Sequence, residues 1–347
     1  ISVLLFFLGS GIWVALSMIG VSAIGMMLFT SRPVGDAMAT TIWGTSSSWT
    51  LTALPLFVWM GEILFRTKLS ENLFKGLSPW MQKLPGGLIH VNVVGCALFA
   101  AISGSSAATV ATVGKMSIPE LRKRKYPEKI LLGSLAGSGT LGLLIPPSII
   151  LIIYGVAVQE SIAKLFIAGI IPGIMIALIF MSYVIIWSLI NKKDMPKILE
   201  NFSFLEKIKR SKQLLPVILL ILAVIGSIYT GIATATEAAS LGVVGALVLS
   251  YFQKSLTVDT FKSSLLGATK TSCMIAFILA GSTFLSLAMG FTGLPRNLAV
   301  WIQNMDLSPY VLIFVLMIFY IILGMFLDGI SAVVLTMAII EPMIRQA

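Results

Sequence analysis

The stretch that most constrains this chain is residues 86–114, GGLIHVNVVGCALFAAISGSSAATVATVG. It is apolar enough to enter a membrane, yet its middle, Ser-Gly-Ser-Ser at 103–106, is small, polar and a poor helix former. Non-helical backbone at membrane depth is tolerated only where protein or a water-filled cavity surrounds it. The pattern predicts a helical hairpin whose tip binds a ligand.

Composition places this hairpin in a polytopic membrane protein. The 347 residues are 57% hydrophobic and only 11% charged, against about 25% charged in a soluble domain. Apolar runs long enough to cross a bilayer predict an all-α fold. We expect spans at 2–29, 44–65, 130–156, 160–190, 213–229, 235–252, 271–290 and 309–340, with a loop at 30–43 and amphipathic segments at 66–85 and 253–270.

Basic residues predict the orientation of the chain in the membrane. Four segments, at 66–85, 115–129, 192–212 and 253–270, hold 20 of the 24 Lys and Arg residues. The positive-inside rule places them in the cytoplasm, which explains the net charge of +10 without a nucleic-acid partner. Since basic segments flank 86–114 on both sides, we expect it to be re-entrant. The alternative is an ordinary span with unusual flanking charges.

An internal repeat supports a second hairpin. Residues 69–73 match 294–298, and residues 103–107 match 328–332, both at an offset of 225. By the charge pattern, span 44–65 and its counterpart near 271–290 cross in opposite directions. Inverted repeats with broken helices near the midplane are typical of secondary transporters.

A third feature lies inside span 130–156, where GSGTLG at 137–142 precedes LLIPPS at 143–148. Three glycines and two prolines predict a broken helix with free backbone carbonyl groups. Such carbonyls, with Ser and Thr hydroxyls, suit a monovalent cation, and half-helix N-termini suit a carboxylate. The alternative is that the glycines allow close helix packing and the prolines form a kink.

The chain contains the segments LPLFVWMGEIL, LPGGL, GCALFAAISGSSAATVATVG, GTLGLLIPPSIILIIYG and LFIAGIIPG. Together they resemble the large membrane subunit of TRAP transporters, the DctM-like family. The resemblance implies a sodium-coupled importer of organic acids, such as C4-dicarboxylates or sialic acid, in a bacterial inner membrane. It implies a small DctQ-like membrane subunit and a periplasmic substrate-binding protein as partners, and an elevator motion. The family pattern continues into a second broken helix, which the repeat places beyond Ala347, so we expect the second half of the site to be incomplete here.

The resemblance also assigns candidate roles to residues. A first sodium site would use Ser103, Gly104, Ser106, Gly137, Thr140 and Gly142, and a second would use Gly324, Asp328 and Ser331. The substrate carboxylate would lie near Ser105, Ser138, Pro146, Pro147 and Ser148, with no metal ion besides sodium. Glu62 and Glu237 are alternative coupling residues.

The same reasoning divides the chain into parts. Residues 1–65 and 157–290 are predicted to form a scaffold, 66–85 and 291–308 two arms, and 86–156 and 309–347 a transport domain. An enzyme is disfavoured because the chain has one His and neither an HExxH nor a GxSxG motif. An ion channel is disfavoured because no segment of the sequence supplies a symmetric filter or a ring of charged residues to line a pore. A sodium-coupled dicarboxylate carrier that works without a binding protein remains the alternative.

Overall fold

The computed structural model describes residues 2–67, 69–196, 202–212, 214–293, 297, 300, 308–325, 327 and 329–346. These residues form helices and no strand, which confirms the predicted all-α class. The helices are α1 (Ser2–Gly9), α2 (Val14–Phe29), α3 (Val34–Ser46), η1 (Trp49–Thr52), α4 (Ala53–Phe65), α5 (Leu69–Met81), α6 (Ile89–Ser103), α7 (Ser106–Lys123), α8 (Glu128–Gly139), η2 (Thr140–Leu143), α9 (Ile149–Val158), α10 (Ile162–Ile190), η3 (Lys192–Asp194), α11 (Phe204–Ser211), α12 (Leu215–Tyr229), α13 (Ala235–Phe252), α14 (Val258–Thr292), α16 (Pro309–Leu323) and α17 (Gly329–Gln346).

Several helices are long and apolar enough to cross a membrane. Among the described residues these are α10, α13 and α14, and two bent helix pairs bring the number of candidate spans from three to five. The exposed surface of α10 is apolar over most of its length, as expected for a helix that contacts lipid. The structure therefore confirms a polytopic membrane protein, while the elevator motion stays a prediction.

Three expected boundaries were wrong. The span at 2–29 is two helices, because Gly11 takes a left-handed conformation (φ +77°) between α1 and α2. Most of the expected loop at 30–43 is helical, since α3 begins directly after Pro33 and Asp36 lies in its first turn. Most of the amphipathic segment 253–270 and the whole span 271–290 lie in one 35-residue helix, α14. This helix contains no Pro, and its glycines do not end it.

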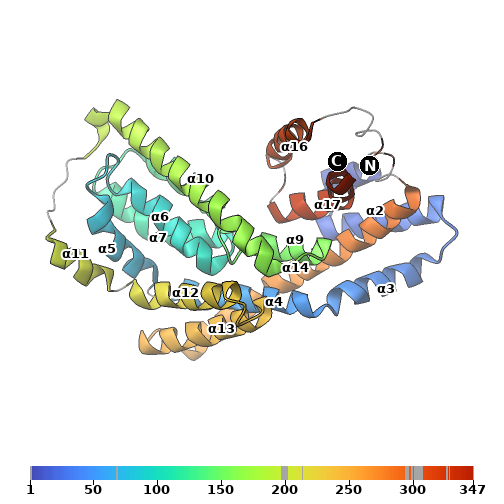
Figure 1. The fold of residues 1–347 in the computed structure, drawn as a ribbon, viewed down its shortest axis with the longest axis horizontal. Helices are drawn as coiled ribbons and strands as arrows, with labels where there is room; N and C mark the ends of the chain where they lie inside the picture. Colours follow the sequence, from blue (N-terminus) through green and yellow to red (C-terminus); the bar gives the residue numbers. More distant parts are fainter. Residues whose placement is uncertain are drawn as a thin grey trace. The chain divides into compact units, whose positions relative to one another are not determined.

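The chain folds into two compact units. One unit contains Thr52–Ile152 and Ser161–Lys270, and we call it the hairpin unit because it holds residues 86–114. Its core joins α6, α8 and α10, with Ile89, Val93 and Val184 fully or almost fully buried. Figure 1 shows α10 running alongside α6.

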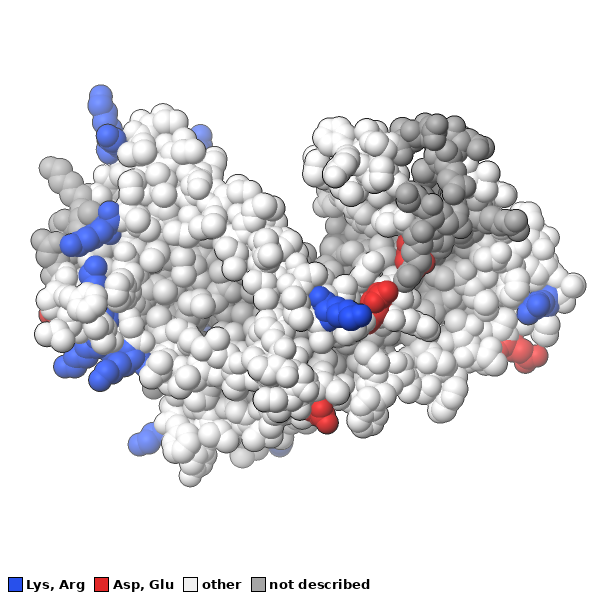
Figure 2. Space-filling model, in the orientation of Figure 1, with Lys and Arg blue, Asp and Glu red and all other residues white. Residues whose placement is uncertain are grey.

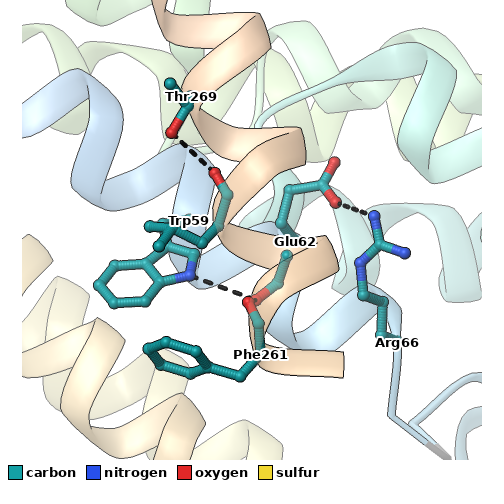
Figure 3. Close-up of polar contacts among 7 residues, drawn as sticks. Trp59, Glu62, Arg66, Phe261 and Thr269 are labelled. Atoms are coloured by element: carbon teal, nitrogen blue, oxygen red, sulfur yellow. Dashed lines mark hydrogen bonds and ion pairs between the residues drawn. The ribbon is translucent and has the colours of Figure 1, made fainter. Parts of the chain in front are cut away.

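Within the hairpin unit, helix α4 packs against the first part of α14. The Trp59 indole nitrogen donates to the Ser264 hydroxyl over 3.3 Å, and the ring meets Phe261 edge-on (Figure 3). One turn further along α4, Glu62 pairs with Arg66 at 2.9 Å. A Cβ atom at Gly267 would lie 2.7 Å from the Glu62 carboxylate, so a glycine on α14 leaves room for that ion pair.

The other unit contains Ile1–Leu51, Ile153–Glu160 and Thr271–Ala347. In it, α16 and α17 form an antiparallel pair: Leu312 packs against Ile340, and the Tyr320 hydroxyl lies 2.7 Å from the Thr336 hydroxyl. The Ser282 hydroxyl donates to the Val334 carbonyl over 2.7 Å and so ties α14 to α17. The break that the repeat predicted in the last apolar stretch is therefore present between α16 and α17.

Candidate functional site

The tip of the first hairpin is built around one glycine. Helix α6 ends at Ser103, and Gly104 takes a left-handed conformation (φ +59°) with its N–H donating to the Ala100 carbonyl over 3.0 Å. This helix ending strongly favours glycine, because a Cβ atom is strained at positive φ. Ser105 then caps α7 by accepting a hydrogen bond from the Ala108 N–H. The Gly-Ser pair thus reverses the chain within two residues.

Hydroxyl groups fix the conformation of this tip. The Thr109 hydroxyl donates to the Ser105 carbonyl over 2.7 Å and lies 2.9 Å from the Ser103 hydroxyl. The Ser103 oxygen in turn accepts from the Ser105 N–H. Thr109 is fully buried. The tip is therefore ordered by its own side chains.

The break after α8 lies against this tip. A single 3-10 turn follows Gly139, and α9 starts at Ile149 after the cis Pro146–Pro147 peptide. The Ser148 hydroxyl caps α9 by accepting from the Leu151 N–H, and it donates to the Leu143 carbonyl. The predicted interruption at 137–148 is thus present.

Backbone atoms make the contact between tip and break. The Ile149 N–H donates to the Gly104 carbonyl over 3.4 Å. A Cβ atom at Gly142 would lie 2.8 Å from the Ser105 carbonyl carbon and oxygen, and one at Gly104 would lie 2.9 Å from the Pro147 carbonyl oxygen. Two segments about 40 residues apart therefore approach more closely than side chains would permit.

The meeting point gathers helix ends of both polarities. The N-terminal ends of α7 and α9, with backbone N–H groups of their first turns, and the C-terminal ends of α6 and α8, with backbone carbonyl groups of their last turns, lie here. N–H groups at helix N-termini attract anions, and carbonyls attract cations. The Ser106 hydroxyl is buried here with no hydrogen-bond partner among the described residues. The chemistry of these helix ends suits an anion beside a cation, and the binding of either stays a prediction.

The other residues predicted for this site lie further from the tip or face other helices. Ser138 is fully buried between α6 and α8, where its hydroxyl lies 3.4 Å from the Asn92 carbonyl. A Cβ atom at Gly137 would lie 3.3 Å from the Phe180 ring, so Gly137 faces α10. Thr140 is exposed and donates to the Gly137 carbonyl. Their roles as ligands stay predictions.

The second predicted sodium set belongs to the other unit. Gly324 follows the last residue of α16, and Ser331 is buried near the start of α17. Asp328 lies outside the described residues. Of the two alternative coupling residues, Glu62 is paired with Arg66, and Glu237 accepts hydrogen bonds from the backbone and hydroxyl of Thr234 at the start of α13.

Sequence reasoning missed two residues at the tip. Thr109 lies in the SGSSAAT motif six residues after Ser103, so its place in the motif was an available signal. Gly61 of α4 packs on the tip, because a Cβ atom there would lie 3.0 Å from the Ser103 Cα atom. Nothing in the local sequence of α4 distinguishes this glycine from one that merely packs between helices.

The family model for the DctM component of tripartite ATP-independent periplasmic transporters matches residues 1–347. The chain belongs to this family. Members of the DctM family are membrane permeases, so this DctM-family chain is a transport protein of the inner membrane and not an enzyme.

Three relatives show the range within the family. The chain is 33% identical over 317 residues to the C4-dicarboxylate TRAP transporter large permease protein DctM of Pseudomonas aeruginosa, covering 91% of this chain and 73% of the relative. It is 31% identical over 336 residues to the sialic acid TRAP transporter large permease protein SiaM of Vibrio cholerae, covering 96% and 77%. It is 28% identical over 344 residues to the isethionate TRAP transporter permease protein DctMQ of Oleidesulfovibrio alaskensis, covering 98% and 53%.

Proposed function

We propose that this chain is the permease subunit of a sodium-coupled TRAP transporter that imports a carboxylate-bearing organic acid. The observation that carries the proposal is the contact between the hairpin tip and the broken helix, where N–H groups and carbonyl groups of four helix ends lie close together. The N-termini of α7 and α9 suit the carboxylate, and the nearby carbonyls and hydroxyls suit Na⁺. Relatives named for C4-dicarboxylate and sialic acid transport support an acidic substrate.

In the proposed mechanism, sodium ions bind at the tips and neutralise the charge of the substrate. Neutralisation lowers the free-energy barrier to moving the loaded transport domain past the low-dielectric part of the membrane. The membrane potential contributes ~2.3 kcal/mol per net positive charge per 100 mV. Two sodium ions per monocarboxylate would make uptake electrogenic. The transport domain would move as an elevator against the scaffold.

The proposed complex includes a periplasmic binding protein and a small membrane subunit. Support comes from the family name, which describes a tripartite periplasmic transporter. The name DctMQ of one relative joins the letters of the M and Q components, which is consistent with a fused small subunit in that protein. For this chain we expect the small subunit as a separate polypeptide or a fused segment.

Reconstitution tests the coupling. Proteoliposomes that contain the chain with its small subunit and binding protein should accumulate labelled substrate when an inward sodium gradient is imposed. An equal potassium gradient is the matched control, and valinomycin-imposed membrane potentials test electrogenicity. Accumulation that is the same with either cation would disprove sodium coupling, and accumulation without the binding protein would favour the simpler dicarboxylate carrier.

A further inference from the structure

A cavity of about 240 Å³ lies in the hairpin unit where α5, α7 and α11 meet, away from the hairpin tip. Three basic residues line it: Lys75 on α5, Arg124 just after α7, and Arg210 on α11. The acidic residue in the lining is Glu120, and its carboxylate accepts from the Arg124 guanidinium at 3.3 Å. The charged residues that line the cavity therefore sum to a positive charge.

The surroundings reinforce this positive charge. Figure 2 shows Lys and Arg side chains gathered at the end of the hairpin unit where α5 and α11 lie in Figure 1. The Arg210 guanidinium stacks 4.2 Å from the centre of the Phe202 ring, which also lines the cavity. A neighbouring cavity of about 440 Å³ adds Lys83 and Lys192. A ligand in this region is expected to be an anion.

Gln82 provides a specific hydrogen-bond donor. It lines both cavities, only 5% of its surface is exposed, and its Nε2 atom has no hydrogen-bond partner among the described residues. Buried amide donors are almost always paired, because leaving one unpaired is unfavourable. An oxygen atom of a bound anion would satisfy this donor.

The apolar surface beside the cavity indicates where the anion comes from. Helix α11 exposes Phe204 (67%) and Leu205 (77%), although it is otherwise highly charged. Trp80 of α5 holds α11 in place, since its indole N–H donates to the Ser211 hydroxyl over 2.8 Å. Basic amphipathic helices with exposed large apolar side chains are typical of the lipid–water interface.

We propose that this cavity binds the phosphate group of an anionic phospholipid headgroup. Lys75 and Arg210 supply charge, the Gln82 amide donates to a phosphate oxygen, and the apolar side chains of α11 contact the acyl region. The site lies on the face of the protein that carries the basic segments, which is the cytoplasmic face by the positive-inside rule. It is separate from the transport site and does not depend on the proposed sodium coupling.

The test uses the full chain purified in a neutral detergent. Thermal unfolding, followed by tryptophan fluorescence, is measured with added phosphatidylglycerol, phosphatidylcholine or inorganic phosphate, and native mass spectrometry counts retained lipid. Phosphatidylglycerol should raise the midpoint, whereas phosphatidylcholine should not. Lys75→Gln with Arg210→Gln should weaken phosphatidylglycerol binding by about fivefold for each cation removed.

Two further variants separate the site from general surface charge. Lys123→Gln with Lys129→Gln removes the same charge from exposed residues that do not line the cavity, and should change binding by less than about twofold. Gln82→Met removes the unpaired amide, so it should leave the lipid-free midpoint unchanged or higher while reducing the lipid-induced shift.

Three outcomes would overturn the proposal. The first is an equal loss of binding in the Lys123/Lys129 control pair, which would indicate non-specific attraction. The second is a phosphatidylglycerol shift that the Lys75/Arg210 and Gln82 variants leave intact. The third is the same shift with inorganic phosphate alone, which would make the ligand a soluble phosphate and not a lipid.

Discussion

Gly142 lies where the hairpin tip meets the broken helix, and its missing side chain allows the contact. A methyl group at this position would lie 2.8–2.9 Å from backbone atoms of Ser105 and Ser106. Because backbone atoms cannot rotate away, Gly142→Ala should destabilise the protein by about 1–3 kcal/mol. It should also reduce transport. Thermal unfolding in detergent and uptake in proteoliposomes measure the two effects.

Gly133 is the matched control for this substitution. It lies in α8, nine residues earlier, and a Cβ atom there would meet nothing within 4 Å. Gly133→Ala should therefore leave the protein as stable or more stable by about 0.5–1 kcal/mol, because alanine favours the helix. If the two variants unfold at the same temperature, the backbone does not approach Gly142 as closely as in the structure.

At the scale of the element, α14 is one continuous helix, whereas the sequence predicted two separate segments. The expected boundary between an amphipathic segment and a span falls at Lys270, but the helix runs from Val258 to Thr292. Proline inside a helix removes a hydrogen bond and clashes with the preceding turn. Lys270→Pro should therefore destabilise the protein by about 3 kcal/mol or more, as measured by thermal unfolding.

Proline at the first residue of α14 provides the comparison. Val258 is exposed, and the preceding Thr257 accepts a hydrogen bond from the Thr260 N–H at the helix start. Because a first-turn N–H has no helical partner, Val258→Pro should be tolerated. Equal stability of the Lys270 and Val258 variants would mean that the helix is interrupted near residue 270.

At the scale of the whole molecule, the open prediction is that 86–114 enters and leaves the membrane on the same side. Lys83 and Lys115 flank the segment, so single cysteines in place of each should react with a membrane-impermeant reagent from the cytoplasmic side only. The background needs Cys273→Ser, because Cys273 is exposed, whereas Cys96 is buried. Labelling of intact cells and of inside-out vesicles distinguishes the two sides.

A cysteine at Ile232 is the control for the opposite side. Ile232 is exposed in the short loop between α12 and α13, and it is separated from the basic segments at 192–212 and 253–270 by one span each. It should react in intact cells after the outer membrane is permeabilised. If Lys83 and Lys115 variants label from different sides, the segment crosses the membrane and the re-entrant hairpin is wrong.

The sequence by itself determined the helical membrane fold and the interruptions at the first hairpin tip and at 137–148. These are local properties: hydropathy dictates which segments leave water, Gly104 ends α6 because it can adopt positive φ, and Pro146 and Pro147 keep the segment between η2 and α9 from being helical. A helix within 66–85 also follows from the amphipathic pattern of that segment, and α5 lies there; its role as an arm stays a prediction. The family followed from motifs at these same interruptions.

Only the tertiary structure decided which of these residues meet. Gly61 approaches the tip because distant helices pack there, and it does not differ locally from other glycines of the chain, whereas the family resemblance had already grouped Gly142 with the tip. Ser138 faces α6 because the register of α8 turns it inward. The cavity beside Gln82 likewise requires three helices to be placed together. Packing of this kind depends on contacts between residues far apart in the chain, which local propensity does not encode.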